Sequence, residues 1–431
     1  MTDESLRVAL AGLGTVGAGV VRLLTENREL VDRRAGRPIR VVAVSARDRA
    51  RDRGVDLAGC QWRDDPAELV GDADVIVEMI GGSDGPALAL TRAALAAGRG
   101  VVTANKAMVA HHGLALARAA EAAQVPFKYE AAVAGGIPVI KAIREGASAN
   151  RLTAVSGILN GTCNHILTAM EATGRAFADV LAEAQAMGLA EADPSTDVGG
   201  TDAAHKLAVL STLCFGTRLD LGAVAVSGIE RVTATDIAEA RALGHRVRLV
   251  GRAVWDGAGR LAQSVAPVLV PDAHPLARVT GAQNAVLVEG NFVGRLVFEG
   301  AGAGAGPTAS AIVADLIDIA RDEYGPPFAM PVAALVDAPR ADPDARRETT
   351  YLRFEVADRP GVLAEIAAAM RDAGVSIESF IQRAPTTAEG ATMVLVTHEG
   401  EAGRVTDALR RLDGSESLRA EPMRMGMLAG D

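Results

Sequence analysis

LRVALAGLGTVG, residues 6–17, joins a short apolar run to a G-x-G-x-x-G pattern. The apolar run predicts a buried strand, and the amphipathic stretch 18–31 that follows predicts a helix. Gly12, Gly14 and Gly17 permit a tight turn and let the backbone approach a pyrophosphate group at the helix N-terminus. Because the glycines lie between a strand and a helix, the pattern predicts a dinucleotide-binding site.

Strands and helices continue to alternate as far as about residue 138. The pattern predicts strands at 39–47, 73–80, 100–106 and 126–132, and helices at 86–97 and 113–123. This alternation is typical of an α/β protein with a Rossmann-type, doubly wound parallel sheet.

The character of the sequence changes between residues 139 and 306, where we expect an α+β domain with helices on one face of an open sheet. Strands are predicted at 152–160, 247–254, 262–270 and 284–290, and helices near 165–172, 177–187, 201–215 and 235–243. A glycine-rich run then leads into a helix predicted at 307–323, with Thr308 or Ser310 as its cap.

The last part of the chain divides into a linker and a small module. Residues 325–348 are rich in Pro, Asp and Arg, and we interpret them as a linker. Residues 349–427 scan as strand, helix, strand, strand, helix and strand. That βαββαβ order predicts a ferredoxin-like fold.

Composition narrows the class of protein. A chain of 431 residues is expected to hold two or three domains. The net charge of −10 argues against a nucleic-acid partner, and no run of about 18 apolar residues predicts a membrane span. Three cysteines without a C-x-x-C pattern, and a start without the features of a signal peptide, predict a cytoplasmic protein.

Lysine is rare in this chain. Only four of the 44 basic residues are lysines: Lys106, Lys128, Lys141 and Lys206. Arg stays protonated, whereas a buried Lys can exchange a proton, so each lysine is a candidate catalytic residue. The alternative is a packed stem with its charge in solvent. Lys106 ends the strand predicted at 100–106, and ligands of such sheets bind at the carboxyl ends of the strands.

Lys206 closes the segment GLAEADPSTDVGGTDAAHK at 188–206. Asp202 and Lys206 are four residues apart and share one face of the predicted helix. Three further carboxylates crowd the loop before that helix: Glu191, Asp193 and Asp197. Two interpretations stay open. One is an acidic loop beside an ordinary helix salt bridge, and the other is a pocket that binds an amino group and places one lysine for proton transfer.

Arg47 bears on the choice of cofactor. A site that prefers NAD usually has an acidic residue at the end of the second strand, where it binds the ribose 2′-hydroxyl. Here that strand ends Ser45-Ala46-Arg47, and Arg47 can pair with the 2′-phosphate of NADP. Asp48 beside it weakens this argument, and a solvated surface charge is the alternative.

Cys163 and His165 suggest a thiolate pair for covalent aldehyde chemistry. Residues i and i+2 at the start of a helix do not face each other, however. We therefore favour the interpretation that NGTCNH, residues 160–165, shapes a loop on the substrate side.

Seven segments, in order, resemble the homoserine dehydrogenase family. They span about residues 10–330, and only the first is generic: AGLGTVG (11–17), VEMIGG (77–82), TANKA (103–107), YEAAVAGGIPVI (129–140), GILNGTCN (157–164), GLAEADPSTDVGGTDAAHK (188–206) and GAGAGPTASAIVAD (302–315). The C-terminal module resembles an ACT domain through DRPGVL (358–363) and VSIESFIQR (375–383).

The resemblance implies reversible hydride transfer between NAD(P) and L-homoserine or L-aspartate 4-semialdehyde, on the route to threonine and methionine. By this resemblance Lys206 gives a proton to the carbonyl oxygen, Lys106 lies beside the nicotinamide and the substrate, and Glu191 and Asp202 bind the substrate. With Arg47 included, the expected cofactor contacts are Gly12, Leu13, Gly14, Thr15, Val16, Gly17, Arg47, Thr103, Lys106, Gly188, Gly302, Gly304 and Gly306.

The resemblance further implies a monovalent cation, usually Na⁺, held by the backbone carbonyls of Glu130, Val133, Gly135 and Ile137. It divides the chain into a cofactor domain (1–138, completed by helix 307–323), a catalytic and dimerisation domain (139–306) and a regulatory ACT-like domain (349–427). Threonine is the expected effector, and a homodimer or homotetramer is the expected assembly.

Two other functions stay open at this point. A phosphorylating semialdehyde dehydrogenase would use Cys163 as its nucleophile and would depend on inorganic phosphate. A non-catalytic, NADP-binding amino-acid sensor would bind the cofactor without turnover.

Overall fold

The computed structural model describes residues 5–256, 258–387 and 390–429. The chain forms two compact units, each built from segments that are distant in sequence. The first unit comprises Met1–Gly161, Asp202–Val224 and Gln283–Ala338, and the second comprises Thr162–Thr201, Ala225–Ala282 and Pro339–Asp431. The predicted α+β domain is therefore shared between the two units, and its predicted boundaries remain an expectation.

The first unit contains a six-stranded parallel sheet in the order β3-β2-β1-β4-β5-β6. This arrangement confirms the doubly wound sheet, because the strand order reverses direction between β1 and β4. The strands are β1 (Leu6–Ala11), β2 (Ile39–Ser45), β3 (Gln61–Arg63), β4 (Val75–Glu78), β5 (Gly100–Thr103) and β6 (Phe127–Lys128).

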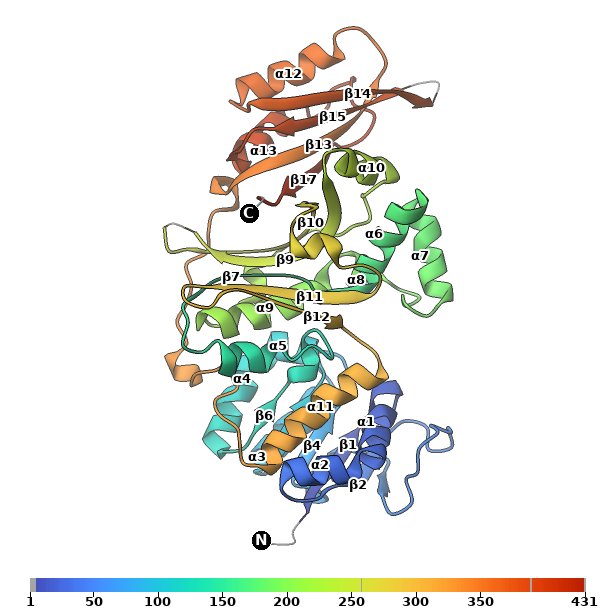
Figure 1. The fold of residues 1–431 in the computed structure, drawn as a ribbon, viewed down its shortest axis with the longest axis vertical. Helices are drawn as coiled ribbons and strands as arrows, with labels where there is room; N and C mark the ends of the chain where they lie inside the picture. The colour runs from blue at the N-terminus through green and yellow to red at the C-terminus, as the bar shows by residue number, and fades with distance from the viewer. Residues whose placement is uncertain (1–4, 257, 388–389, 430–431) are drawn as a thin grey trace. The chain divides into compact units, whose positions relative to one another are not determined.

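Helices cover both faces of this sheet, and one of them arrives from much later in the chain (Figure 1). Helix α11 packs along α1 and shares the apolar core of β1 and β2. It begins at Ala305 after Gly304, so the predicted cap at Thr308 or Ser310 is wrong. The helices are α1 (Thr15–Glu26), α2 (Arg28–Ala35), α3 (Pro86–Ala96), α4 (Lys106–Ala123) and α11 (Ala305–Ala320).

The remainder of the first unit adds three antiparallel strands and a buried helix. Strand β11 pairs with β7 on one side and with β12 on the other. Helix α9 is buried continuously from Asp202 to Cys214. The elements are α5 (Val139–Lys141), a π-helical turn (Ala142–Gly146), β7 (Leu152–Ile158), α9 (Thr201–Phe215), β11 (Gln283–Gly290) and β12 (Gly294–Ala301).

The second unit begins with helices around a long antiparallel hairpin. Strands β9 and β10 pair over their full length, and β8 adds a short parallel edge to β10. The elements are α6 (Gly161–Thr173), α7 (Phe177–Ala186), α8 (Ser195–Val198), β8 (Ala225–Val226), α10 (Ala234–Ala242), β9 (His245–Trp255) and β10 (Leu261–Pro271).

The same unit contains the C-terminal module, whose βαββαβ order confirms the prediction. Its sheet runs β17-β13-β15-β14, and α12 and α13 share one apolar core with it. Strand β17 also pairs with β10, so the module continues the sheet of the hairpin. The elements are β13 (Arg347–Ala357), α12 (Val362–Asp372), β14 (Ile377–Thr387), β15 (Gly390–Thr397), β16 (Gly400–Glu401), α13 (Ala402–Arg411) and β17 (Met423–Met427).

The segment predicted as a linker packs against the first unit over its first part. Phe328 is fully buried against Tyr129, whose hydroxyl donates to the carbonyl of Pro327 at 2.7 Å. The backbone N–H of Val332 donates to the Glu121 carboxylate. None of the helices in the described part of the chain is long and apolar enough to cross a membrane.

Candidate active site

The first glycine turn has a geometry that only glycine can adopt. Gly12 has a φ of +101°, and a Cβ there would lie 2.7 Å from the carbonyl oxygen of Met79. A Cβ at Gly17 would lie 2.3 Å from the carbonyl oxygen of Gly12. Gly14, by contrast, faces open space and is the N-cap residue that precedes helix α1. The turn therefore presents backbone N–H groups at a helix N-terminus, as a pyrophosphate requires.

A second glycine turn lies beside the first. Gly304 has a φ of +115° and is the N-cap residue that precedes α11, and Gly306 faces open space. A Cβ at Gly19 of α1 would lie 2.8 Å from the carbonyl oxygen of Ala305, so the two helices meet at their N-terminal turns. Neither helix has an acidic residue in its first turn. Both positive helix ends are thus available to an anionic cofactor.

Two residues predicted to contact the cofactor have side chains that are buried and contact other parts of the protein. Leu13 is buried in the core of the sheet, and Thr103 is fully buried with its hydroxyl donating to Glu78 at 2.6 Å. These two residues can therefore reach a cofactor only through their backbone. Thr15 is exposed and Val16 is half-buried, so their side chains remain accessible.

Arg47 is exposed just beyond the end of β2, as a residue that pairs with a phosphate must be. A second arginine that sequence reasoning missed lies nearby. Arg53 donates from Nε to the carbonyl of Leu13 at 2.8 Å, and its guanidinium stands 5.4 Å from the centre of the Trp62 ring. The alternation of Arg and Asp over residues 47–53 is the sequence feature that could have indicated Arg53 as a candidate. Arg53 ties that segment to the first glycine turn.

Lys106 is the first residue of α4, so the predicted strand at 100–106 is too long and the predicted helix starts too late. The cause is a local cap. The side chain of Asn105 accepts from the N–H of Met108 at 3.1 Å and donates to the carbonyl of Gly82 at 2.7 Å. The backbone N–H of Asn105 in turn donates to the Thr103 hydroxyl at 3.0 Å. These bonds fix the backbone from which Lys106 projects.

Asp202 joins the two lysines predicted to be catalytic. Its Oδ1 lies 2.9 Å from Nζ of Lys106, and its Oδ2 lies 2.7 Å from Nζ of Lys206. Asn160 donates to the same Oδ2 at 3.0 Å, and Lys206 also donates to the carbonyl of Leu159 at 2.7 Å. Sequence spacing predicted the contact of Asp202 with Lys206, and the structure adds Lys106 to it.

Burial and charge set the protonation of this group. Burial alone would raise the pKa of the Asp202 carboxyl, but the two ammonium groups outweigh it and hold that pKa well below its usual range. Asp202 and Lys206 are almost fully buried, whereas the side chain of Lys106 is 41% exposed. The site therefore has a buried lysine and an accessible lysine on opposite oxygens of one carboxylate.

His205 lies next to Lys206 on α9 and packs edge-on against His111, with ring centres 5.3 Å apart. Burial, followed by the proximity of His111, lowers the pKa of His205. Both effects disfavour the protonated form of the His205 ring.

Glu191 and Gly188 belong to the second unit, in the turn after α7. The Glu191 side chain is exposed, and its backbone carbonyl accepts from the Gln185 amide at 3.0 Å. Gly188 has a φ of +72°, as a residue that ends a helix commonly does. The roles of these two residues as substrate and cofactor contacts remain predictions.

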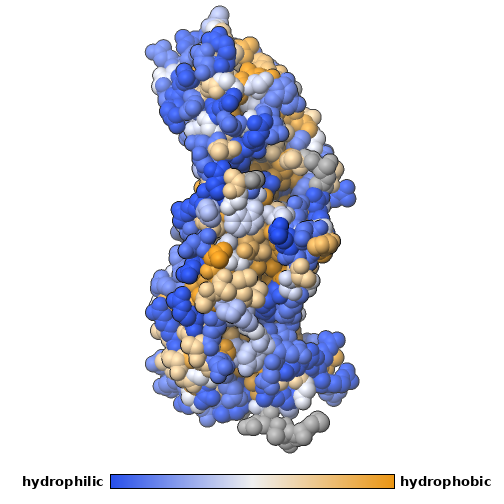
Figure 2. Space-filling model, turned by 90° about the vertical axis from the view of Figure 1, so that its left-hand side faces the viewer, coloured by the Kyte–Doolittle hydropathy of each residue, from blue (hydrophilic) through white to orange (hydrophobic). Residues whose placement is uncertain are grey.

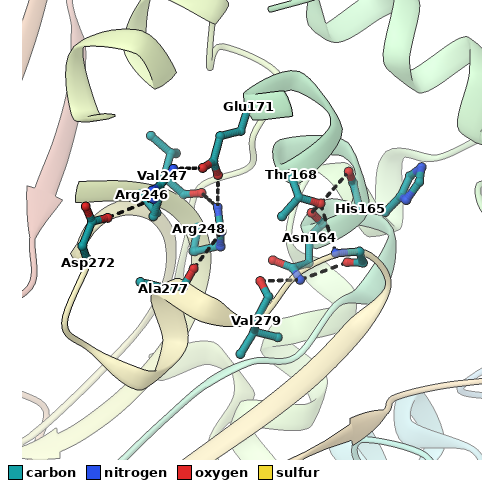
Figure 3. Close-up of polar contacts among 11 residues, drawn as sticks. Asn164, His165, Thr168, Glu171, Arg246, Val247, Arg248, Asp272, Ala277 and Val279 are labelled. Atoms are coloured by element: carbon teal, nitrogen blue, oxygen red, sulfur yellow. Dashed lines mark hydrogen bonds and ion pairs between the residues drawn. The ribbon is translucent and has the colours of Figure 1, made fainter. Parts of the chain in front are cut away.

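The Cys163 thiol does not have the surroundings of a nucleophile. It is fully buried and donates to the carbonyl of Asp197 at 3.2 Å. Figure 3 shows the His165 ring pointing away from the Asn164 amide, which donates to the carbonyls of Val279 and Gly281. The start of α6 is thus a packed structural element, and the phosphorylating mechanism through Cys163 finds no support in it.

Farther along α6, Glu171 accepts from two arginines of β9, as Figure 3 also shows. Arg248 lies 3.0 Å from the Glu171 carboxylate and also donates to the carbonyl of Ala277 at 2.9 Å. This buried ion pair attaches α6 to the β9–β10 hairpin.

The carbonyls predicted to bind a cation belong to an unusual buried loop. Ala134 and Gly135 are both left-handed, with φ of +56° and +52°, and a Cβ at Gly135 would lie 2.4 Å from the carbonyl oxygen of Gly302. The carbonyls of Val133 and Gly135 accept no hydrogen bond from the described residues. These two oxygens are therefore available to a hard cation, which prefers oxygen ligands, and the monovalent-cation site remains a prediction.

Two further observations concern this loop. The carbonyl of Ile137 accepts from the N–H of Val139 at 2.7 Å and that of Glu130 accepts from the N–H of Val133 at 3.4 Å, so these two oxygens are less free than the other two. The Glu130 carboxylate accepts from the N–H groups of Ile140 and Lys141, while burial and Asp315 raise the pKa of Glu130 to about 7. Within the described residues, no cluster of three or more His, Cys, Asp or Glu could hold a metal ion through side chains.

The fold and these contacts define a class of protein: an oxidoreductase with a nicotinamide-dinucleotide fold and a lysine–carboxylate–lysine group. Family models described as "Homoserine dehydrogenase, NAD binding domain", "Homoserine dehydrogenase" and "ACT domain" match residues 12–130, 138–317 and 350–414. The chain belongs to the homoserine dehydrogenase family, whose members are oxidoreductases acting on the CH–OH group of homoserine.

Individual relatives agree with the family models over the whole chain. A homoserine dehydrogenase of Pseudomonas aeruginosa is 42% identical, with 98% of each chain covered. One of Neisseria gonorrhoeae is 41% identical over 96% of this chain and 97% of its own. The solved structure of a homoserine dehydrogenase from Thiobacillus denitrificans has 41% identity and a TM-score of 0.92, over 99% of this chain and 98% of its own.

Proposed function

We propose that this chain reduces L-aspartate 4-semialdehyde reversibly to L-homoserine, with Lys206 as the proton donor and NADP as the preferred cofactor. The observation that carries the proposal is the bridge of Asp202 between Lys106 and Lys206. It places a buried ammonium group beside an accessible one at the carboxyl edge of a nucleotide-binding sheet, where ligands of this fold bind.

Lys206 is held in a direction that suits proton transfer. Of its three N–H donors, one binds Asp202 and one binds the carbonyl of Leu159. The third remains to donate to the carbonyl oxygen of the aldehyde. In the oxidation direction the same nitrogen takes the proton back from the hydroxyl group.

Lys106, Asp202 and Glu191 act on the rest of the substrate in this proposal. Asp202 and Glu191 bind its ammonium group, and Lys106 orients its carboxylate near the cofactor. Because Asp202 keeps its charge at any working pH, it holds both the substrate and Lys206 in place.

The cofactor, when bound, supplies or accepts the hydride. Its pyrophosphate would lie on the two helix N-termini, against Gly12–Gly17 and against the turn that includes Gly302, Gly304 and Gly306. Arg47 would pair with a 2′-phosphate, and this is the argument for NADP over NAD. A Na⁺ ion on the carbonyls near Gly135 would stabilise a loop that touches Gly302.

The C-terminal module and exposed apolar side chains support proposals about regulation and assembly. We propose threonine as the effector, bound near residues 358–363, and a homodimer or homotetramer. The face of the molecule drawn in Figure 2 has apolar side chains among mainly hydrophilic ones. Phe292 and Val297, on the hairpin of β11 and β12, are exposed by 89% and 44%. A second copy covering that hairpin would remove these groups from water.

A steady-state assay with homoserine and each cofactor, with and without threonine, tests the proposal. Turnover with a lower KM for NADP, and inhibition by threonine, are the expected results. Activity that requires inorganic phosphate would restore the Cys163 mechanism, and cofactor binding without turnover would restore the amino-acid sensor. The three described cysteines are free thiols, which agrees with the expected cytoplasmic location.

A further inference from the structure

One carbonyl oxygen beside the proposed proton donor receives two hydrogen bonds. Asn284, the second residue of β11, donates from Nδ2 to the carbonyl of Leu159 at 3.0 Å. Lys206 donates to the same oxygen at 2.7 Å. Strand register explains the reach of Asn284, because its neighbour Ala285 pairs with Ile158, the last residue of β7.

The Asn284 amide also lies flat against the second glycine turn. A Cβ at residue 302 would lie 2.1 Å from Cγ of Asn284, 2.2 Å from its Nδ2 and 2.5 Å from its Oδ1. No side chain can be accommodated at Gly302 while the amide keeps this position. A single side chain thus contacts both the proposed cofactor turn and the carbonyl that holds Lys206.

Stability does not explain this asparagine. Its Oδ1 is buried and has no hydrogen-bond partner in the described residues, and the residue is 1% exposed. A buried acceptor without a partner destabilises the folded state. Turning the amide over would place Oδ1 against the Leu159 carbonyl, so the orientation is fixed by that bond.

We propose that Asn284 is a positioning residue for proton transfer. By holding the Leu159 carbonyl it fixes the direction of the Lys206 ammonium group. By lying on Gly302 it makes that direction depend on the conformation of the glycine turn. This inference rests on the proposed role of Lys206 as proton donor.

Asn284→Leu tests the proposal, because leucine has a similar volume and lacks the amide. We expect kcat to fall by about 10- to 100-fold, since small displacements of a catalytic group have effects of this size. The KM for homoserine, and the Kd for the reduced cofactor measured by fluorescence titration, should stay within about threefold. The unfolding temperature should be unchanged or higher, because a buried acceptor without a partner has been removed.

Asn291→Leu is the matched control. Asn291 follows the other end of β11 and accepts from the N–H of Arg151 at 2.9 Å. Its replacement should lower the unfolding temperature and leave kcat unchanged. If leucine cannot be packed at position 284, Asn284→Ala should show the same fall in kcat with the same Kd. An unchanged kcat, or a fall in kcat that follows a weaker Kd or a lower unfolding temperature, overturns the proposal.

A double variant separates this inference from the proposed function. If Asn284 acts through Lys206, Asn284→Leu should lower kcat much less in a Lys206→Arg background than in the parent chain. An equal fall in both backgrounds overturns the positioning role and leaves the role of Lys206 intact. Full activity of Lys206→Arg alone overturns the proposed function, and the inference with it.

Discussion

Lys206 is one of four lysines in a chain that otherwise uses arginine, and its contacts let its role be tested with a conservative change. Lys206→Arg should fold and bind the cofactor but lose turnover by about 10²- to 10⁴-fold, because arginine keeps the charge and does not exchange a proton near neutral pH. Lys141→Arg is the control, since Lys141 forms a 2.7 Å ion pair with Asp318. A kcat within about threefold of the parent for Lys206→Arg would show that Lys206 is not the donor.

Asp202 predicts a dependence of stability on pH. Because the pKa of Asp202 is lowered in the folded state, its stabilising effect is fully present above the usual carboxyl pKa of about 4 and is lost as the pH falls below it. Asp202→Asn should lower the free energy of unfolding at pH 7 by roughly 3–5 kcal/mol, since two ammonium groups lose their partner. Thermal unfolding at pH 7 and pH 3 checks this. A difference between variant and parent that grows toward pH 3 would contradict it.

Two arginines near the first glycine turn should differ in their effects. Arg47→Ala should raise the KM for NADP far more than the KM for NAD, because only NADP has the phosphate that Arg47 would bind. Arg53→Ala should weaken both cofactors alike, because Arg53 holds the carbonyl of Leu13. Equal changes of both KM values in Arg47→Ala would leave Arg47 as a surface charge.

At the scale of elements, the first glycine turn can be tested against another left-handed glycine. Gly12→Ala should weaken cofactor binding by more than tenfold and destabilise the sheet, because its Cβ would meet the Met79 carbonyl. Gly36 is also left-handed but faces open space. Gly36→Ala should cost only about 1–2 kcal/mol of backbone strain and leave cofactor binding unchanged. Titration of each variant with the cofactor, beside thermal unfolding, separates the two effects.

The elements that sequence predicted well are those with local signals. The parallel sheet was predicted from the alternation of strands and helices and from the glycines between a strand and a helix. Both are patterns of residues that are close in sequence. The sequence analysis did not predict strand β12, because the strand depends on pairing with β11 and the residues of β12 alone do not indicate that pairing. The start of α4 was missed because it depends on how Asn105 caps the helix. The positioning role of Asn284 could not be predicted from the sequence, because it depends on contacts with Leu159 and Gly302 that form only in the folded chain.

At the scale of the molecule, the C-terminal module is more firmly attached than a linker sequence suggests. Strand β17 pairs with both β10 and β13, and Asp236 of α10 accepts from Tyr351 at 3.0 Å and from Arg353 at 2.7 Å. Ending the chain near Arg347 would remove these two partners of a buried carboxylate and leave, among the described residues, only its contacts with Thr233. We therefore expect such a truncated chain to unfold at a lower temperature, and point variants become the better test of regulation.

Arg353 is the residue of choice for that test. It joins Asp236 to Glu355, which accepts from the Thr392 hydroxyl at 2.9 Å. Arg353→Leu should retain kcat and weaken the proposed inhibition by threonine by a coupling of about 1–3 kcal/mol. Arg347→Leu, on the exposed end of the same strand, should leave inhibition unchanged. If inhibition is equally strong in both variants, Arg353 does not couple the effector site to the active site.

Helix α11 has a consequence for the synthesis of this protein. Strands β1–β6 are complete by residue 128, whereas the helix that covers one face of their core ends at residue 320. At roughly 5–20 residues per second, a ribosome needs on the order of 10–40 s to make the intervening chain. During that interval α1 and α2 cover this core alone, and the apolar side chains that α11 later covers are exposed. We infer that a chaperone which shields nascent chains would increase the yield of folded protein. This increase would not be expected from the stability of the finished fold alone.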